Sequence, residues 1–271
     1  MPITGSKRLK TLSDKLEPWL TQSKTLEFIE TDPIRFPYKF RADKQTCELV
    51  SFLAAMLSYG RRTSILSAVT DLLDRIGPEP LVFIDKFETE AHRSSFDGFI
   101  YRFYKPEDML FLFERLQWAY KHYGSLENLF LTCGDIEKEG LQQVLSSFVN
   151  CLLYKNVDNV AGQSRIYGNG VKFMLADPRR GGACKRFNMW LRWMVRDDGI
   201  DLGLWKSALK PSDLLLPLDA NTARAARHLK LTRRKADDWQ TAEEITAVLR
   251  RLSPIDPIQY DFALFSYGMA L

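Results

Sequence analysis

Hydrophobic residues recur along most of the chain with the period of an α-helix. Between Ser64 and Ile76 they fall three and four positions apart, and Gly77-Pro78 then ends the pattern. Residues 48–57 are apolar on all sides, which indicates a buried helix. Further helices are predicted over 106–123, from about 125, and over 141–154, 184–196, 220–229, 245–252 and 257–269. Strand signals are rare and short, so we expect an all-α fold.

The composition is that of an ordinary globular protein. The 271 residues are 45% hydrophobic and 27% charged, enough to build a core without disulfides or metals. No uncharged apolar run reaches the length of roughly 18 residues that would suggest a membrane-spanning helix. Lys7, Arg8 and Lys10 are not followed by an apolar stretch, so we expect no secretory signal and a cytoplasmic protein.

The metal-binding residue types are few and scattered. The four cysteines (47, 133, 151 and 184) form no CxxC pair, and the three histidines (92, 122 and 228) form no HxxxH pair. This spacing argues against a zinc site or an iron–sulfur cluster. We therefore expect no metal and no cofactor, and we expect free thiols in a reducing compartment.

Positive charge is concentrated in two stretches of the second half. Residues 171–196 hold seven basic residues against one acidic residue, and residues 219–235 hold six against one. The whole chain carries only +4, so the remainder is net acidic. Such a field suits a polyanion, whose phosphates would release counterions on binding, and DNA is the expected partner. A solvated basic face without a ligand is the alternative.

The segment Asp177-Pro178-Arg179-Arg180-Gly181-Gly182-Ala183 joins two predicted helices. Its two glycines can adopt positive φ or let another backbone approach closely. The helix that follows would point its free N–H groups and positive dipole end at whatever lies beyond the loop, as in phosphate sites. The alternative is a helix–turn–helix connection that needs glycine only for its geometry.

Two residue types suited to glycosidic chemistry follow the loop. Lys185 comes directly after it, and Asp219 lies 34 residues later, in front of a predicted helix that carries Arg224. A neutral lysine amine can attack a sugar carbon, and a carboxylate can stabilise a cation-like transition state. By themselves, Lys185 could instead contact phosphate and Asp219 could be a helix N-cap.

The order of these features resembles the helix–hairpin–helix DNA glycosylase superfamily, which includes endonuclease III and the 8-oxoguanine DNA glycosylases. The Lys–Asp spacing is most similar to that of the archaeal 8-oxoguanine branch. Over nearly its whole length the chain also resembles an uncharacterised bacterial family of unknown function. The strings that carry this second resemblance are Asp32-Pro33-Ile34, Tyr101-Arg102-Phe103, residues 185–196, Pro217-Leu218-Asp219 and residues 257–264.

The resemblance implies a fold and an activity. It implies one glycosylase-like domain over 1–271, with two helical lobes (about 46–155, and 1–45 plus 160–271) flanking a cleft. It implies a monomeric base-excision repair enzyme for an oxidised base such as 8-oxoguanine. That enzyme would be a glycosylase alone, or a glycosylase with an AP lyase step. Lys185 would be the Schiff-base nucleophile, and Asp219 would stabilise the sugar cation from within roughly 4–7 Å.

The implied DNA-binding residues lie on the hairpin, on the helices after it, and on a loop after the buried helix 48–57. They are Arg179, Arg180, Gly181, Gly182, Arg186, Arg192, Arg224, Tyr59, Arg61 and Arg62. Trp190, Trp193 and Phe187 could join Tyr59 in a base pocket, although core positions are favoured for the tryptophans.

The chain departs from the superfamily in its hairpin. Arg179-Arg180-Gly181-Gly182 replaces the usual apolar-Pro-Gly-apolar-Gly, which puts the cation-binding backbone of that hairpin in doubt. Two alternatives to the repair enzyme remain. One is a nucleic-acid-binding protein that keeps the fold without the chemistry, and the other is an enzyme for RNA or a modified nucleotide.

Overall fold

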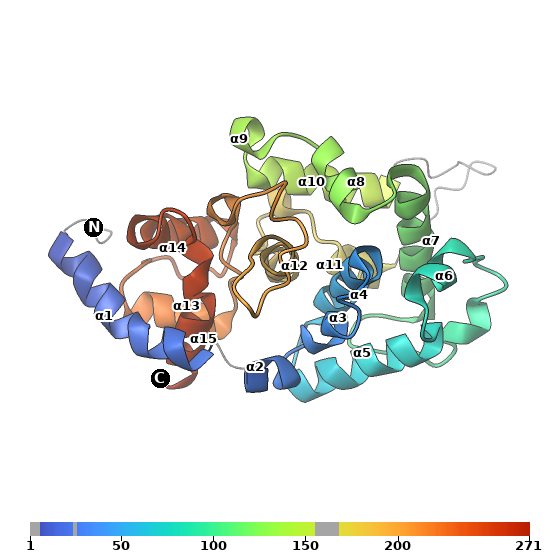
Figure 1. The fold of residues 1–271 in the computed structure, drawn as a ribbon, viewed down its shortest axis with the longest axis horizontal. Helices are drawn as coiled ribbons and strands as arrows, with labels where there is room; N and C mark the ends of the chain where they lie inside the picture. Colours follow the sequence, from blue (N-terminus) through green and yellow to red (C-terminus); the bar gives the residue numbers. More distant parts are fainter. Residues whose placement is uncertain (1–5, 24–25, 155–167) are drawn as a thin grey trace. The chain divides into compact units, whose positions relative to one another are not determined.

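The computed structural model describes residues 6–23, 26–154 and 168–271, and the regular structure of these residues is helical (Figure 1). Their only bridge pairs of the β type are two isolated ones, Tyr101 with Tyr104 and Gly182 with Asp238. The all-α class is therefore confirmed. Among the described helices, none is long and apolar enough to cross a bilayer.

The chain divides into two compact units. One, the terminal unit, combines residues 1–32 with 178–271, and the other, the central unit, spans 33–177. The sequence analysis gave lobe boundaries at about 46–155, and at 1–45 plus 160–271, and of these bounds 155 and 160 lie outside the described residues. The single glycosylase-like domain and its cleft stay predictions.

The central unit is built around a helix that is buried on every side. This helix, α4, spans Lys44–Leu57, and Asp43 caps it by accepting hydrogen bonds from the backbone N–H groups of Gln45 and Thr46. The other helices of the unit are α3 (Arg35–Tyr38), α5 (Arg62–Ile76), α6 (Pro80–Asp85), η1 (Arg93–Phe96), α7 (Pro106–Tyr123), α8 (Leu126–Thr132), α9 (Ile136–Glu139), α10 (Leu141–Tyr154) and α11 (Asn169–Met174).

A buried carboxylate connects α4 to α7 and α8. Glu48 accepts hydrogen bonds from the N–H groups of Leu126 (2.7 Å) and Glu127 (3.0 Å) at the start of α8, and from the hydroxyl of Tyr120 on α7 (2.9 Å). A negative charge at a helix N-terminus satisfies N–H groups that have no partner within the helix. Glu48 therefore satisfies its hydrogen-bonding capacity inside the core while it fixes α8.

The terminal unit has a core rich in tryptophan. Trp190, Trp193, Trp205 and Trp239 are fully buried, and the Trp190 and Trp205 rings meet edge to face at 4.8 Å. The helices of the unit are α1 (Ser6–Ser23), α2 (Leu26–Thr31), η3 (Pro178–Arg180), α12 (Lys185–Val195), η4 (Pro211–Asp213), α13 (Ala220–His228), α14 (Trp239–Leu252), η5 (Pro257–Tyr260) and α15 (Asp261–Met269).

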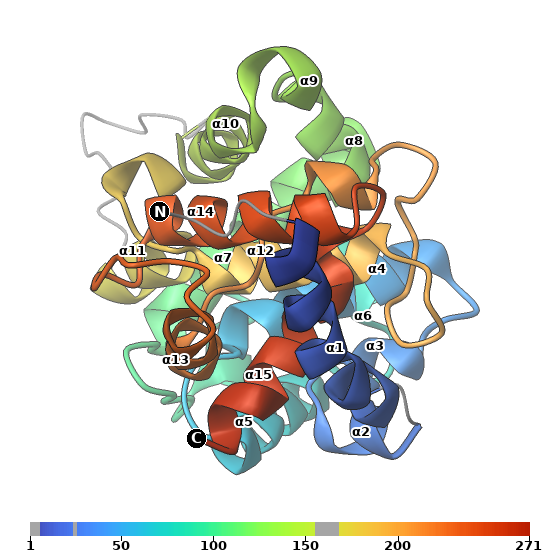
Figure 2. The same ribbon diagram turned by 90° about the vertical axis from the view of Figure 1, so that its left-hand side faces the viewer.

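Helix α15 packs against both α1 and α13, and Figure 2 shows α1 and α15 side by side. Gly268 of α15 lies so close to α13 that a Cβ there would be 2.1 Å from the Asn221 carbonyl oxygen. Arg224 of α13 donates to the Gly268 carbonyl with its Nε (2.9 Å) and Nη2. The absence of a side chain at Gly268 therefore allows α15 to lie against the start of α13.

One predicted helix boundary is wrong. The sequence pattern predicted a helix over 245–252, yet α14 already begins at Trp239. Asp238 is the N-cap, and its carboxylate accepts from the Thr241 N–H at 2.8 Å. Asp is as good an N-cap as Thr, and the earlier start lets Trp239 enter the core.

The terminal unit contains a buried network of arginines and aspartates. Arg192 binds Asp201 (Nε to Oδ1, 3.2 Å) and Asp261, while Arg196 binds Asp201 and Asp256 (Nη2 to Oδ2, 2.9 Å). Burial raises the pKa of Asp201 to about 6, although both arginines lower it. A raised pKa in the folded state means that ionising Asp201 at neutral pH costs stability, so the network depends on both of its arginine partners.

We predict that Asp201→Ala destabilises the terminal unit by roughly 3–5 kcal/mol, because two buried guanidinium groups lose a partner. Equilibrium denaturation in urea measures this change. The matched control is Lys206→Ala, which removes the exposed ion pair between Lys206 and Asp197 and should cost less than about 1 kcal/mol. Equal losses in the two variants would show that the buried network contributes no more than a surface pair.

Candidate functional site

Lys185 is the first residue of α12 and lies where the backbone turns sharply. The residue before it, Cys184, has a left-handed conformation (φ 45°) and makes no side-chain cap. Inside the first turn, the Asn188 amide donates to the Ala183 carbonyl at 3.0 Å. The N–H groups of the first turn give this end of the helix a positive potential.

Asp219 performs two tasks with its two oxygens. It is the N-cap of α13, and its Oδ1 accepts from the Thr222 N–H at 2.9 Å. Its Oδ2 lies 3.1 Å from the Lys185 Nζ. The predicted N-cap is thus confirmed, and the cap leaves one carboxylate oxygen for the lysine.

Lys185 and Asp219 form a direct ion pair within the terminal unit. Their separation is shorter than the expected 4–7 Å, because the ammonium contacts the carboxylate and no space for a ligand remains between them. The Lys185 side chain is 36% exposed and that of Asp219 is 18% exposed. A ligand can therefore reach the amine, while the carboxylate is largely sheltered from water.

A third charged group, Asp261, lies within electrostatic range of this pair. Burial raises the pKa of Asp261, Arg192 opposes the rise, Asp219 adds to it and Lys185 opposes it. The sequence analysis assigned no catalytic or binding role to Asp261. The signal that could have found Asp261 is its place in the string of residues 257–264, one of the strings that carry the family resemblance.

The arginine–glycine hairpin comes directly before α12. Gly181 has φ +89°, a conformation that favours glycine, and its carbonyl accepts from the Trp239 N–H at 3.2 Å. Gly182 lacks a positive φ, and apart from its chain neighbours no atom of the described residues lies within 4 Å of where its Cβ would be. Only Gly181 therefore needs glycine for its conformation, and Gly182 leaves open space in front of the backbone.

The arginines assigned to DNA lie in different environments. Arg179 and Arg180 are exposed at the hairpin and Arg186 is half-buried on α12. Arg192 does not belong to this set, because it is buried and its guanidinium binds Asp201 and Asp261. Arg224 is exposed, but its guanidinium donates to the end of α15, so its first role is to hold that helix.

The aromatic side chains near Lys185 belong to the core. Phe187, Trp190 and Trp193 are at most 1% exposed, which supports the core positions that the sequence favoured for the tryptophans. These three residues therefore cannot stack with a base without unfolding of α12.

The central unit carries the remaining predicted contacts, at the loop between α4 and α5. Tyr59 is 44% exposed, and Arg61 and Arg62 are exposed beside it. The tight turn of residues 101–104 supports this loop, since the Tyr101 hydroxyl donates to the Tyr59 carbonyl at 2.7 Å. Phe103 at that turn is 56% exposed, and its ring lies 6.3 Å from that of Tyr59. Phe103 was part of a motif but had no role from the sequence.

The comparisons with known proteins identify one family. The family model described as "Protein of unknown function (DUF2400)" matches residues 32–270. The chain belongs to this family. No curated protein and no solved structure matched. The expected resemblance to an uncharacterised family is confirmed, and the resemblance of this DUF2400 chain to the DNA glycosylases stays a prediction.

We predict that the two tasks of Asp219 can be separated by substitution. Asp219→Asn keeps an Oδ1 acceptor for the Thr222 N–H, so the cap of α13 survives and the melting temperature stays within about 2 °C. Asp219→Ala removes the cap and should cost about 1 kcal/mol. Thermal unfolding followed by circular dichroism measures both. A loss as large for Asn as for Ala would show that the ion pair with Lys185, rather than the cap, supplies the stability.

Proposed function

We propose that this protein is a DNA base-excision glycosylase, with an AP lyase step, that acts on an oxidised base. The observation that carries the proposal is the contact of the Lys185 Nζ with the Asp219 Oδ2 at 3.1 Å, in a position that remains partly open to solvent. Base removal through a covalent sugar intermediate requires an amine and a carboxylate side by side, and a substrate sugar must part this contact to reach both groups.

The reaction assigns one role to each group. The Lys185 Nζ, once deprotonated, attacks C1′ of the nucleoside, the glycosidic bond breaks, and the base leaves with the bonding electrons and takes up a proton. The sugar ring then opens to give an imine between Nζ and C1′. Loss of a C2′ proton expels the 3′ phosphate, and water finally releases the enzyme. Asp219 stabilises the positive charge that develops at the sugar.

The surroundings of the pair support these roles. The contact with Asp219 holds the amine of Lys185 at the first turn of α12. The buried Asp261, paired with Arg192, lies within electrostatic range of both groups.

Phosphate binding is assigned to the hairpin. Arg179 and Arg180 are exposed there, and the backbone at Gly182 has open space before it. The N–H groups at the start of α12 add positive potential to the same end of the helix. The hairpin therefore supplies contacts to a DNA strand that do not depend on its sequence.

The alternative is a nucleic-acid-binding protein without catalysis. The double role of Asp219 favours it, because a carboxylate that caps α13 and pairs with Lys185 also suits a purely structural link between α12 and α13. The two functions differ in one respect: only the enzyme needs the amine of Lys185 to form a covalent bond.

We expect the wild type to form a DNA adduct that borohydride traps, on an oligonucleotide carrying an oxidised base or an abasic site. Lys185→Ala should abolish this adduct while binding changes only a few-fold. Asp219→Asn, which keeps the cap, should slow base release by roughly 10²-fold, equivalent to about 2.7 kcal/mol of transition-state stabilisation.

The control for the adduct is Lys206→Ala, which removes an exposed lysine of the same unit that is paired with Asp197. It should trap as well as the wild type. If the wild type forms no adduct with any lesion, or if Asp219→Asn releases base at the wild-type rate, the catalytic assignment is wrong and the binding protein is favoured.

We predict that charge reversal of Arg179 and Arg180 weakens binding to all DNA sequences alike. Each phosphate contact that is lost should lower the slope of log K against log salt by roughly 0.9. Gly182→Ala is the matched steric variant. Within the described part of the chain no atom opposes its Cβ, so stability should not change while a close phosphate would be displaced. Unchanged affinity and slope in these variants would show that the hairpin does not contact DNA.

A further inference from the structure

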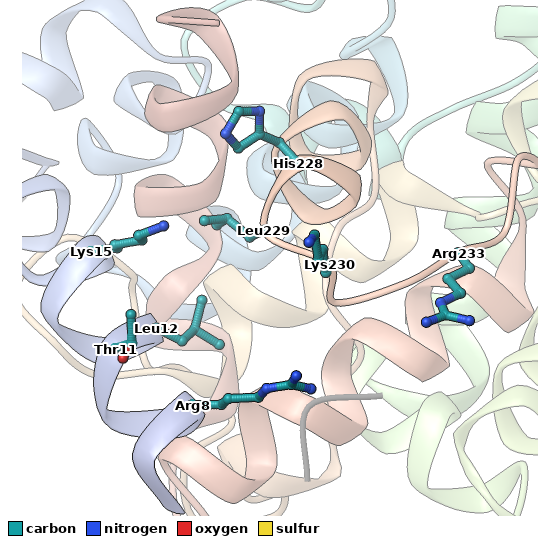
Figure 3. Close-up of a pocket in the computed structure, with 8 residues that line it drawn as sticks. All are labelled: Arg8, Thr11, Leu12, Lys15, His228, Leu229, Lys230 and Arg233. Carbon is teal, nitrogen blue, oxygen red and sulfur yellow. The ribbon is translucent and has the colours of Figure 1, made fainter. Parts of the chain in front are cut away.

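A second basic site lies in the terminal unit, between α1 and the C-terminal end of α13. It is a pocket of about 390 Å³ (Figure 3). Its lining residues are Arg8, Thr11, Leu12, Lys15, His228, Leu229, Lys230 and Arg233. Four of these eight are lysine or arginine and none is acidic, so the pocket has a strongly positive potential.

The pocket has an apolar floor and a cationic rim. Leu12 and Leu229 are buried, whereas the charged side chains around them are exposed. Figure 3 shows Arg8 and Lys15 on α1 opposite the segment that carries Lys230 and Arg233. Charges that converge from separate segments can contact one ligand from several sides.

The lysines and arginines of the rim differ from neighbouring arginines in whether they form ion pairs with carboxylates. In the same stretch Arg227 binds Asp237 and Arg234 binds Asp238, so the available aspartates are already engaged. Among the described residues, by contrast, Lys230 and Arg233 form no ion pair, and Arg8 and Lys15 form none either. The positive charge of the rim is therefore not neutralised within the described part of the chain.

Lys230 holds its place on the rim in an unfavourable backbone conformation. Its φ is +60°, and its N–H donates to the Arg227 carbonyl (3.0 Å) while the Leu231 N–H donates to the Ala226 carbonyl (2.8 Å). These bonds form the Schellman motif that ends α13, in which the left-handed position usually holds glycine. A lysine at this position costs stability, which suggests a use for its charge.

We propose that this pocket binds a ligand that carries two or more phosphate groups, such as a polyphosphate chain or a stretch of nucleic-acid backbone. Four permanent cations around an open pocket match more than one phosphate. The proposal does not rest on the base-excision activity, because Asp219, the partner of Lys185, caps the start of α13 and the pocket lies at the end of that helix. Variants of the pocket leave that ion pair untouched.

The binding experiment uses two phosphate probes with the full-length protein at low salt. Calorimetry measures sodium tripolyphosphate, and fluorescence anisotropy measures an undamaged, fluorescein-labelled single-stranded 12-mer of DNA. Lys15→Gln and Lys230→Gly should each raise Kd about five-fold for the probe that resembles the natural ligand, because each variant removes one cation near a phosphate. The matched control is Lys10→Gln, which removes an exposed lysine of α1 that does not line the pocket and should leave Kd unchanged.

The stability of the Lys230 variants supplies a second readout. Lys230→Gly should raise the melting temperature by roughly 2–4 °C, because glycine adopts positive φ without strain. Lys230→Arg keeps both the charge and the strain, so its Kd and melting temperature should match those of the wild type. A variant that is more stable and yet binds more weakly cannot owe its weaker binding to unfolding.

The probes separate the two sources of phosphate. Weaker tripolyphosphate binding in the pocket variants supports a small polyphosphate ligand, and weaker DNA binding alone supports a nucleic-acid backbone. The proposal is overturned if neither probe is affected, or if Lys10→Gln weakens binding as much as Lys15→Gln does.

Discussion

The terminal unit depends on one buried interaction, the sharing of Asp201 between Arg192 and Arg196. Both guanidinium groups are at most 3% exposed, and each also binds a carboxylate from the last part of the chain, Asp261 or Asp256. Charges so deeply buried are tolerated only when every partner is present. Because Arg192 and Arg196 lie on α12, or at its end, and Asp261 begins α15, this network fixes α15 relative to α12.

The candidate site follows from that arrangement. With α15 fixed, the contact at Gly268 determines where α13 begins, and Asp219 caps that beginning. The same α12 that carries the buried arginines presents Lys185 at its first turn, so the 3.1 Å contact between Lys185 and Asp219 closes a ring of α12, α15 and α13. The buried Arg–Asp network therefore positions the helices that carry this ion pair. The basic pocket lies at the opposite end of α13.

The sequence predicted what depends on local pattern. Helical periodicity located α5, α7 and α10, and the Asp219 cap was visible because capping is a short-range effect. The sequence analysis wrongly assigned Arg192 to DNA. A run of positive charge does not show that this arginine has buried partners, Asp201 and Asp261, which lie 9 and 69 residues away in the sequence. The helix α1 was not predicted, since only packing against α15 reveals the use of its buried Leu12, Leu16 and Leu20. The sequence analysis expected roughly 4–7 Å between Lys185 and Asp219, the spacing that leaves room for a sugar carbon between them. In the structure the two charges contact each other directly, at 3.1 Å.

The central claim is that the amine of Lys185 forms a covalent bond with a nucleoside sugar. The most direct measurement is peptide mapping by mass spectrometry of the protein after borohydride reduction with DNA that carries an oxidised base or an abasic site. The account predicts a single modified peptide with the sugar remnant on Lys185. A remnant on a different lysine or on the amino terminus, or a protein without any remnant, would contradict it.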